Sequence, residues 1–182
     1  MIFGEKPKAN MSSLLEKGDH PELDNTDLLN IDGVQRYQSL IGSLQWAVSI
    51  GRIDVTTAVM SLSSFRAVPR KGHLERAKRI VGYLSKMKHG VIRFRTALPD
   101  YSDIPEKIYD WEKSVYGSAH EAKPHDAHIT LGKHIILAHY VDANLYHEMI
   151  TGRSVTDILH FINQTLVEWF YKKQATCETA TY

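Results

Sequence analysis

Cysteine is almost absent from this 182-residue sequence, and its one cysteine, Cys177, excludes an internal disulfide and a zinc site with several cysteine ligands. No apolar run approaches the ~20 residues that a membrane-spanning helix needs. The N-terminal sequence MIFGEKPKANMSS lacks the apolar core of a secretory signal. Glycine-rich phosphate loops and His-Glu-Xaa-Xaa-His spacings are missing as well. These absences predict a soluble protein, compatible with a reducing intracellular compartment and without a membrane partner.

Charge is close to balanced over the whole chain but is placed unevenly along it. With 22 basic and 21 acidic residues, the total says little about partners. Ten of the basic residues lie between Arg66 and Arg95, where Glu75 is the one acid, which leaves 12 bases against 20 acids elsewhere. The sequence therefore combines one strongly basic segment with an acidic remainder.

The N-terminal half contains three stretches with the apolar spacing of a helix. Residues 1–33 are polar and acidic, and we expect them to form an extended connector. A first helix is predicted from Val34 with Gly51 at its end, Asp54 is placed to cap a second, and a third should run from about residue 72 to 88. The three apolar faces consist of Tyr37, Leu40, Ile41, Leu44, Ala47 and Val48, then Val55, Ala58, Val59, Leu62 and Phe65, then Leu74, Ala77, Ile80, Val81, Leu84 and Met87. This pattern indicates a small helical bundle over residues 34–95.

The C-terminal half changes from a linker to a strand-like composition. Prolines and scattered acids mark residues 96–132 as a linker. Residues 134–144, 154–163 and 165–174 are rich in β-branched and aromatic residues, and the sequences TGR and NQT suit the hairpin turns around them. The region 133–182 is therefore predicted to be an antiparallel meander of three strands. The predicted fold class of the chain is α+β.

The basic segment is the first candidate functional surface. Arg76, Arg79 and Lys86 are spaced so that they mostly avoid the apolar face of the third predicted helix. A cationic face of this kind neutralises backbone phosphates without reading the base sequence. The alternative is a face that is merely solvated. The expected nucleic-acid-binding residues are Arg70, Lys71, Arg76, Lys78, Arg79, Lys86 and Lys88.

Asp142 is the second candidate, because an acid within an apolar strand is costly to bury without a partner or a metal. A carboxylate at a strand end can hold Mg²⁺ together with several others, whereas an aspartate that faces water needs no ligand. The ten histidines offer no metal-binding spacing in the sequence. His134 and His139, for example, lie an odd number of positions apart, so a strand would place them on opposite faces.

Two ordered series of residues resemble the Pol polyprotein of copia-type LTR retrotransposons. The first runs from YQSLIGSL at 37–44 through RIDV at 52–55 to AKRI at 77–80, and is similar to the thumb-like stretch that follows the reverse transcriptase palm. The second comprises YVDAN at 140–144 and, further on, TGRSVT and KKQAT, and resembles the start of the ribonuclease H domain. The resemblance implies that the helical region grips a primer–template duplex or RNA–DNA hybrid. It also implies that Asp142 is the first carboxylate of a catalytic site whose cofactor in the parent enzyme is Mg²⁺.

The resemblance further implies that both active sites are incomplete. Ala143 stands where the second acid of a Tyr-Xaa-Asp-Asp polymerase turn is required, and no two aspartates are adjacent anywhere in the chain. The next ribonuclease H acid is expected beyond Tyr182, since Glu178 falls too early in the pattern. Asp157 stands where a small glycine is usual in the family.

Three functions follow as hypotheses. The first is a fragment of a reverse transcriptase and ribonuclease H polyprotein, catalytically inactive by itself and with no stably bound Mg²⁺. The second is a non-catalytic nucleic-acid-binding module that uses residues 66–95. The third is an active ribonuclease H fragment that depends on Asp142. We expect the meander to be only marginally stable alone, because an incomplete sheet leaves an open edge and an uncovered apolar face.

Overall fold

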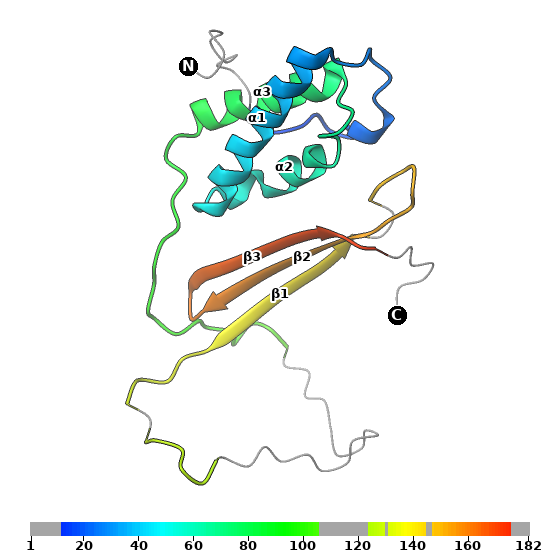
Figure 1. The fold of residues 1–182 in the computed structure, drawn as a ribbon. Coiled ribbons are helices and arrows are strands. Elements are labelled where there is room, and N and C mark those ends of the chain that lie inside the picture. Colours follow the sequence, from blue (N-terminus) through cyan, green and yellow to red (C-terminus); the bar gives the residue numbers. More distant parts are fainter. Residues whose placement is uncertain (1–11, 106–123, 130, 145–146, 176–182) are drawn as a thin grey trace.

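The computed structural model describes residues 12–105, 124–129, 131–144 and 147–175. Three α-helices are followed by one antiparallel sheet of three strands, which confirms the predicted α+β class (Figure 1). The elements are the short 3-10 helix η1 (Pro21–Leu23), α1 (Ile31–Ser49), the short 3-10 helix η2 (Ile53–Val55), α2 (Thr56–Ser63), α3 (Lys71–Lys86), β1 (Leu137–Asn144), β2 (Val155–Ile162) and β3 (Thr165–Lys173). None of the helices in the described ranges combines the length and the apolar character needed to cross a membrane.

Helix α1 begins at Ile31, ahead of the predicted Val34, because Asn30 supplies an N-cap. The Asn30 side-chain oxygen accepts a hydrogen bond from the Gly33 backbone N–H at 2.9 Å. Such a cap satisfies one of the donors that the first turn of a helix leaves without a partner. At the other end of α1 the chain turns at Gly51, as predicted. Its φ of +114° is a backbone conformation that favours glycine.

The predicted cap of the second helix is wrong. Asp54 lies inside η2, and the N-cap position of α2 is held by Val55, whose side chain makes no capping hydrogen bond. The Asp54 carboxylate instead accepts from Nε and Nη2 of Arg52, at 2.9 and 2.8 Å. The guanidinium offers two parallel N–H donors and a full positive charge, whereas a helix N-terminus offers backbone N–H groups alone, which favours the pairing with Arg52.

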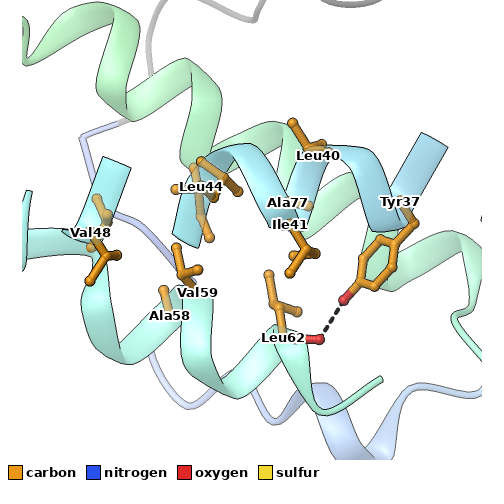
Figure 2. Packing of buried hydrophobic residues seen from close by; sticks show 11 residues of the cluster. Tyr37, Leu40, Ile41, Leu44, Val48, Ala58, Val59, Leu62 and Ala77 are labelled. Atoms are coloured by element: carbon orange, nitrogen blue, oxygen red, sulfur yellow. Dashed lines mark hydrogen bonds between the residues drawn. The ribbon is translucent and has the colours of Figure 1, made fainter. Parts of the chain in front are cut away.

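The core of the helical bundle is formed by apolar positions that the spacing predicted, although Met87, predicted on the same face of the third helix, lies beyond the end of α3 and is 44% exposed. Figure 2 shows α1 facing α2 and α3 through these side chains, with the Tyr37 hydroxyl directed at the end of α2. That hydroxyl donates a 2.7 Å hydrogen bond to the Leu62 carbonyl oxygen, which satisfies a buried polar group, and burial raises the pKa of Tyr37. The buried cluster consists of Tyr37, Leu40, Ile41, Leu44, Val48, Val55, Ala58, Val59, Leu62, Ala77 and Ile80.

The sheet has the strand order β1-β2-β3, as expected of a meander. The turn between β2 and β3 has two residues, and Asn163 adopts a φ of +53° there, which asparagine tolerates better than most residues. In the register of β1 and β2, Asp142 lies directly opposite Asp157. The sequence alone could not show this pairing, because a shift of one residue would have placed the two carboxylates on opposite faces.

The helices contact the sheet through β3, the strand nearest to them, while β1 lies on the far side (Figure 1). Trp169 of β3 packs against the helical core. By contrast, every residue of β1 except Ala138 is exposed, including Val141 at 66%. Within the described part of the chain, β1 therefore forms an unpaired edge of the sheet and has exposed apolar side chains.

Candidate nucleic-acid interface

An acidic segment of the chain lies along the basic helix α3. We call residues 13–27 the acidic strap. The Arg76 side chain donates to both carboxylate oxygens of Asp19, with distances from 2.6 to 3.0 Å, and also to the Asp24 carboxylate. These side chains are largely shielded from solvent, with Asp24 only 4% exposed. Arg76 therefore holds two separate acids of the strap against α3.

Three more basic residues of α3 and its N-cap contact the same strap. Arg79 donates to the Glu16 carboxylate at 2.8 Å and to the side chain and backbone oxygens of Ser13. Lys71 forms an exposed ion pair of 2.8 Å with Asp27. Arg70, the N-cap residue, donates to the backbone oxygen of Thr26. Most of the positive charge at the start of α3 is thus neutralised or hydrogen-bonded by the protein itself.

The N-terminal turn of α3 is built to receive the strap. A Cβ atom at Gly72 would collide with the Asp24 carboxylate, so this position needs a glycine. The His73 ring is 3% exposed; its Nδ1 accepts from the Arg70 backbone N–H at 3.1 Å, and its Nε2 lies 2.9 Å from the Pro21 carbonyl oxygen. This arrangement requires a neutral ring that carries its proton on Nε2.

The charge states follow from these contacts. The hydrogen bonds to Asp19 raise the pKa of Arg76 further above its ordinary value, although partial burial opposes them. Burial alone would raise the pKa of Asp24, but hydrogen bonds from Thr26 and Arg76 outweigh it and lower the pKa. Burial also lowers the pKa of His73, since the charged ring would lose solvation. The strap and α3 are therefore held together by fully charged pairs around one neutral histidine.

The seven basic residues predicted to bind nucleic acid fall into two groups. Arg70, Lys71, Arg76 and Arg79 contact the acidic strap, and Lys78 forms an ion pair of 3.0 Å with Glu75. Lys86 and Lys88 are exposed, and neither has an ion pair or a side-chain hydrogen bond within the described ranges. Sequence reasoning missed the strap, although the acidic character of residues 1–33 beside a basic helix was a usable signal.

Asp142 and Asp157 form a pair of carboxylates on neighbouring strands. Burial raises the pKa of Asp157, and the negative charge of Asp142 raises it further. Among the residues that the structure describes, no three His, Cys, Asp or Glu side chains come together in a way that could hold a metal ion. A Mg²⁺ site needs several oxygen ligands, so these two carboxylates form at most a part of one.

The sheet also brings together two histidines whose proximity the sequence spacing did not predict. His139 on β1 lies across from His160 on β2, with their ring centroids 4.7 Å apart, and Nδ1 of His160 is 2.9 Å from the Glu168 carboxylate. Cys177 and Glu178 lie outside the described residues.

Comparison with known proteins reveals a distant and partial similarity. Over 93 residues the chain is 33% identical to the putative transposon Ty5-1 protein of Saccharomyces cerevisiae, a match that covers 48% of this chain. The match spans 30% of the length of that yeast protein. No protein-family model and no solved structure matches the chain. The similarity relates the chain weakly to a transposon protein.

Proposed function

We propose that this chain derives from the Pol polyprotein of a copia-type LTR retrotransposon and that its own activity is non-catalytic contact with nucleic acid. In this proposal α1, α2 and α3 correspond to the thumb-like region of a reverse transcriptase. The three-stranded sheet corresponds to the first strands of a ribonuclease H domain. The partial similarity to a yeast transposon protein supports the proposal, together with the ordered residue series of both regions.

The observation that supports nucleic-acid contact is a set of exposed cations that have no ion pair with any of the residues the structure describes. Lys86 and Lys88 lie at and just beyond the end of α3, and both are exposed without an ion pair in the described ranges. Exposed cations of this kind bind phosphates and release counterions, which makes the affinity depend steeply on salt. The start of α3 contributes less, since Arg76 and Arg79 are already engaged by the acidic strap.

The carboxylate arrangement favours binding over catalysis. Among the residues that the structure describes, Asp142 is paired with one acid across the strands, Asp157, whereas a two-metal hydrolytic centre needs a larger set of oxygen ligands around both ions. Burial raises the pKa of Asp157, and the negative charge of Asp142 adds a smaller rise, which is the part that a bound Mg²⁺ would relieve. The alternative, a Mg²⁺-dependent ribonuclease H fragment, rests on this pair and is tested below.

Fluorescence anisotropy with a labelled RNA–DNA hybrid tests the proposal on the full chain. We expect binding that weakens as salt rises, and a Lys86→Ala, Lys88→Ala double variant with a salt slope smaller by about one unit per lysine. Lys71→Ala is the matched control, because Asp27 already pairs with that lysine, and it should change the slope less. Absence of binding at low salt would refute the proposal.

The same hybrid distinguishes binding from catalysis. With Mg²⁺ present, the parent chain and an Asp142→Asn variant should both leave the RNA strand intact. Cleavage by the parent that requires Mg²⁺ and disappears in Asp142→Asn would instead establish the ribonuclease H alternative.

A further inference from the structure

A run of exposed basic and apolar residues follows α3, and we call residues 86–95 the basic ribbon. Its cations Lys86, Lys88, Arg93 and Arg95 are exposed, and none forms an ion pair within the described residues. Phe94 stands between the two arginines and is 83% exposed. An aromatic ring so open to solvent is unusual for a folded chain, because it leaves its apolar surface in contact with water.

The basic ribbon is anchored to the rest of the protein at two places. In its second half, Ile92 lies against Gly51 at the end of α1, where a Cβ atom added at that glycine would come within 3.0 Å of the Ile92 Cδ1. At its end, the Thr165 hydroxyl accepts from the Arg95 backbone N–H at 2.8 Å and donates to the Arg95 carbonyl oxygen at 3.0 Å. The chain runs down one side of the molecule from the end of α3 to the turn that joins β2 and β3, and both anchors lie toward the end of this path (Figure 1).

The residues just after the ribbon are tied to the same turn. The Asn163 side chain donates to the Thr96 carbonyl oxygen and the Gln164 side chain donates to the Leu98 carbonyl oxygen, both at 3.0 Å. The backbone next to Phe94 is therefore held in place by hydrogen bonds to the β2–β3 hairpin. A ligand that binds there has little backbone ordering left to complete, which favours affinity.

We propose that the basic ribbon binds single-stranded nucleic acid, with a base stacked on Phe94 and the adjoining phosphates neutralised by Arg93 and Arg95. The inference rests on the proposed nucleic-acid contact and specifies its ligand. Stacking needs an unpaired base, because the faces of paired bases are covered by their neighbours in a duplex. Alternating cations and exposed aromatic rings are the combination that binds single strands without reading their sequence.

The experiment compares a labelled oligothymidylate with a labelled RNA–DNA hybrid of equal length in anisotropy titrations. Phe94→Ala should weaken binding of the single strand by roughly 5- to 100-fold and leave hybrid binding nearly unchanged. Its salt slope should match that of the parent, because a phenyl ring releases no counterions, whereas Arg93→Ala should reduce the slope. Phe94→Tyr should retain the affinity, since the ring is kept.

Val91→Ala is the matched control, because Val91 is 72% exposed in the same ribbon but offers no ring for stacking. Equal losses in Phe94→Ala and Val91→Ala would overturn the inference in favour of a general apolar contact. Unchanged single-strand affinity in Phe94→Ala would also overturn it, and the proposed function would stand if Lys86→Ala, Lys88→Ala still weakened hybrid binding. If neither oligonucleotide binds the parent chain, both proposals fail.

Discussion

The guanidinium of Arg76 holds the carboxylate of Asp19, 57 positions earlier in the chain, through Nε and Nη2 at distances of 2.6 to 3.0 Å. A second acid of the strap, Asp24, binds the same guanidinium. A phosphate that approached Arg76 would have to replace two carboxylates that are largely shielded from water. The acidic strap thus engages most of the cations at the start of α3 in contacts within the protein. The cations that are still available to a ligand lie mainly in the basic ribbon.

The ion pair between Asp24 and Arg76 should contribute measurably to the free energy of unfolding. Asp24→Ala removes a carboxylate that accepts from Arg76 and Thr26, and we expect a loss of about 2 kcal/mol in the free energy of unfolding. Urea denaturation followed by circular dichroism measures the change. Asp27→Ala is the control, since Asp27 and Lys71 form an exposed pair, and its denaturation midpoint should hardly move.

Gly72→Ala should reproduce much of the Asp24→Ala effect without removing a charge. The added Cβ would occupy the space of the Asp24 carboxylate and push it away from Arg76. Combining the two substitutions should therefore cost less than the sum of the separate losses. Fully additive losses would show that Asp24 and Gly72 do not share one contact.

Acidification should weaken the fold through His73. Burial lowers the pKa of this ring from its ordinary value of 6.5, so the unfolded chain takes up a proton at higher pH than the folded chain. Its contribution to stability is complete above about pH 6.5 and is lost as the pH falls toward the lowered value. The carboxyl groups of Asp24 and Asp54, whose pKa values are also lowered, should add a further loss below about pH 4.

Denaturation midpoints measured between pH 7.5 and pH 5 test the histidine component. A His73→Gln variant should be less stable at neutral pH but should show a flatter profile over this range, because glutamine does not titrate. His139→Gln, which changes an exposed histidine of β1, should keep the slope of the parent. A profile for His73→Gln as steep as that of the parent would contradict the assignment.

The carboxylate pair on the sheet should oppose folding at neutral pH. Asp157→Asn removes the repulsion between Asp142 and Asp157, so we expect the variant to be more stable by roughly 0.2–1 kcal/mol. The pKa of Asp157 is raised in the folded protein. The destabilisation is therefore absent at low pH and grows as the pH rises through the raised pKa of Asp157. The gain should therefore disappear below about pH 3.8, the ordinary value for an aspartate, where Asp157 is protonated in both the folded and the unfolded chain. A gain that is the same at pH 3 and pH 7 would point to a cause other than charge.

The local elements were determined by the sequence. The helical spacing of Tyr37, Leu40 and Leu44 predicted one face of α1, and all three residues are buried. The turn at Asn163 was likewise predictable, because few residues adopt the backbone conformation that a two-residue hairpin needs. In each case the residues that decide the structure lie within a few positions of one another.

Contacts between distant segments were decided only by the tertiary structure. The register of the sheet set Asp142 opposite Asp157, and the path of residues 13–27 brought Asp19 to Arg76. A charged side chain can pair with any opposite charge within reach, and distances between remote residues are set by packing. The sequence therefore determined that helix α3 is basic, while the fold determined which of its charges are still open to a ligand.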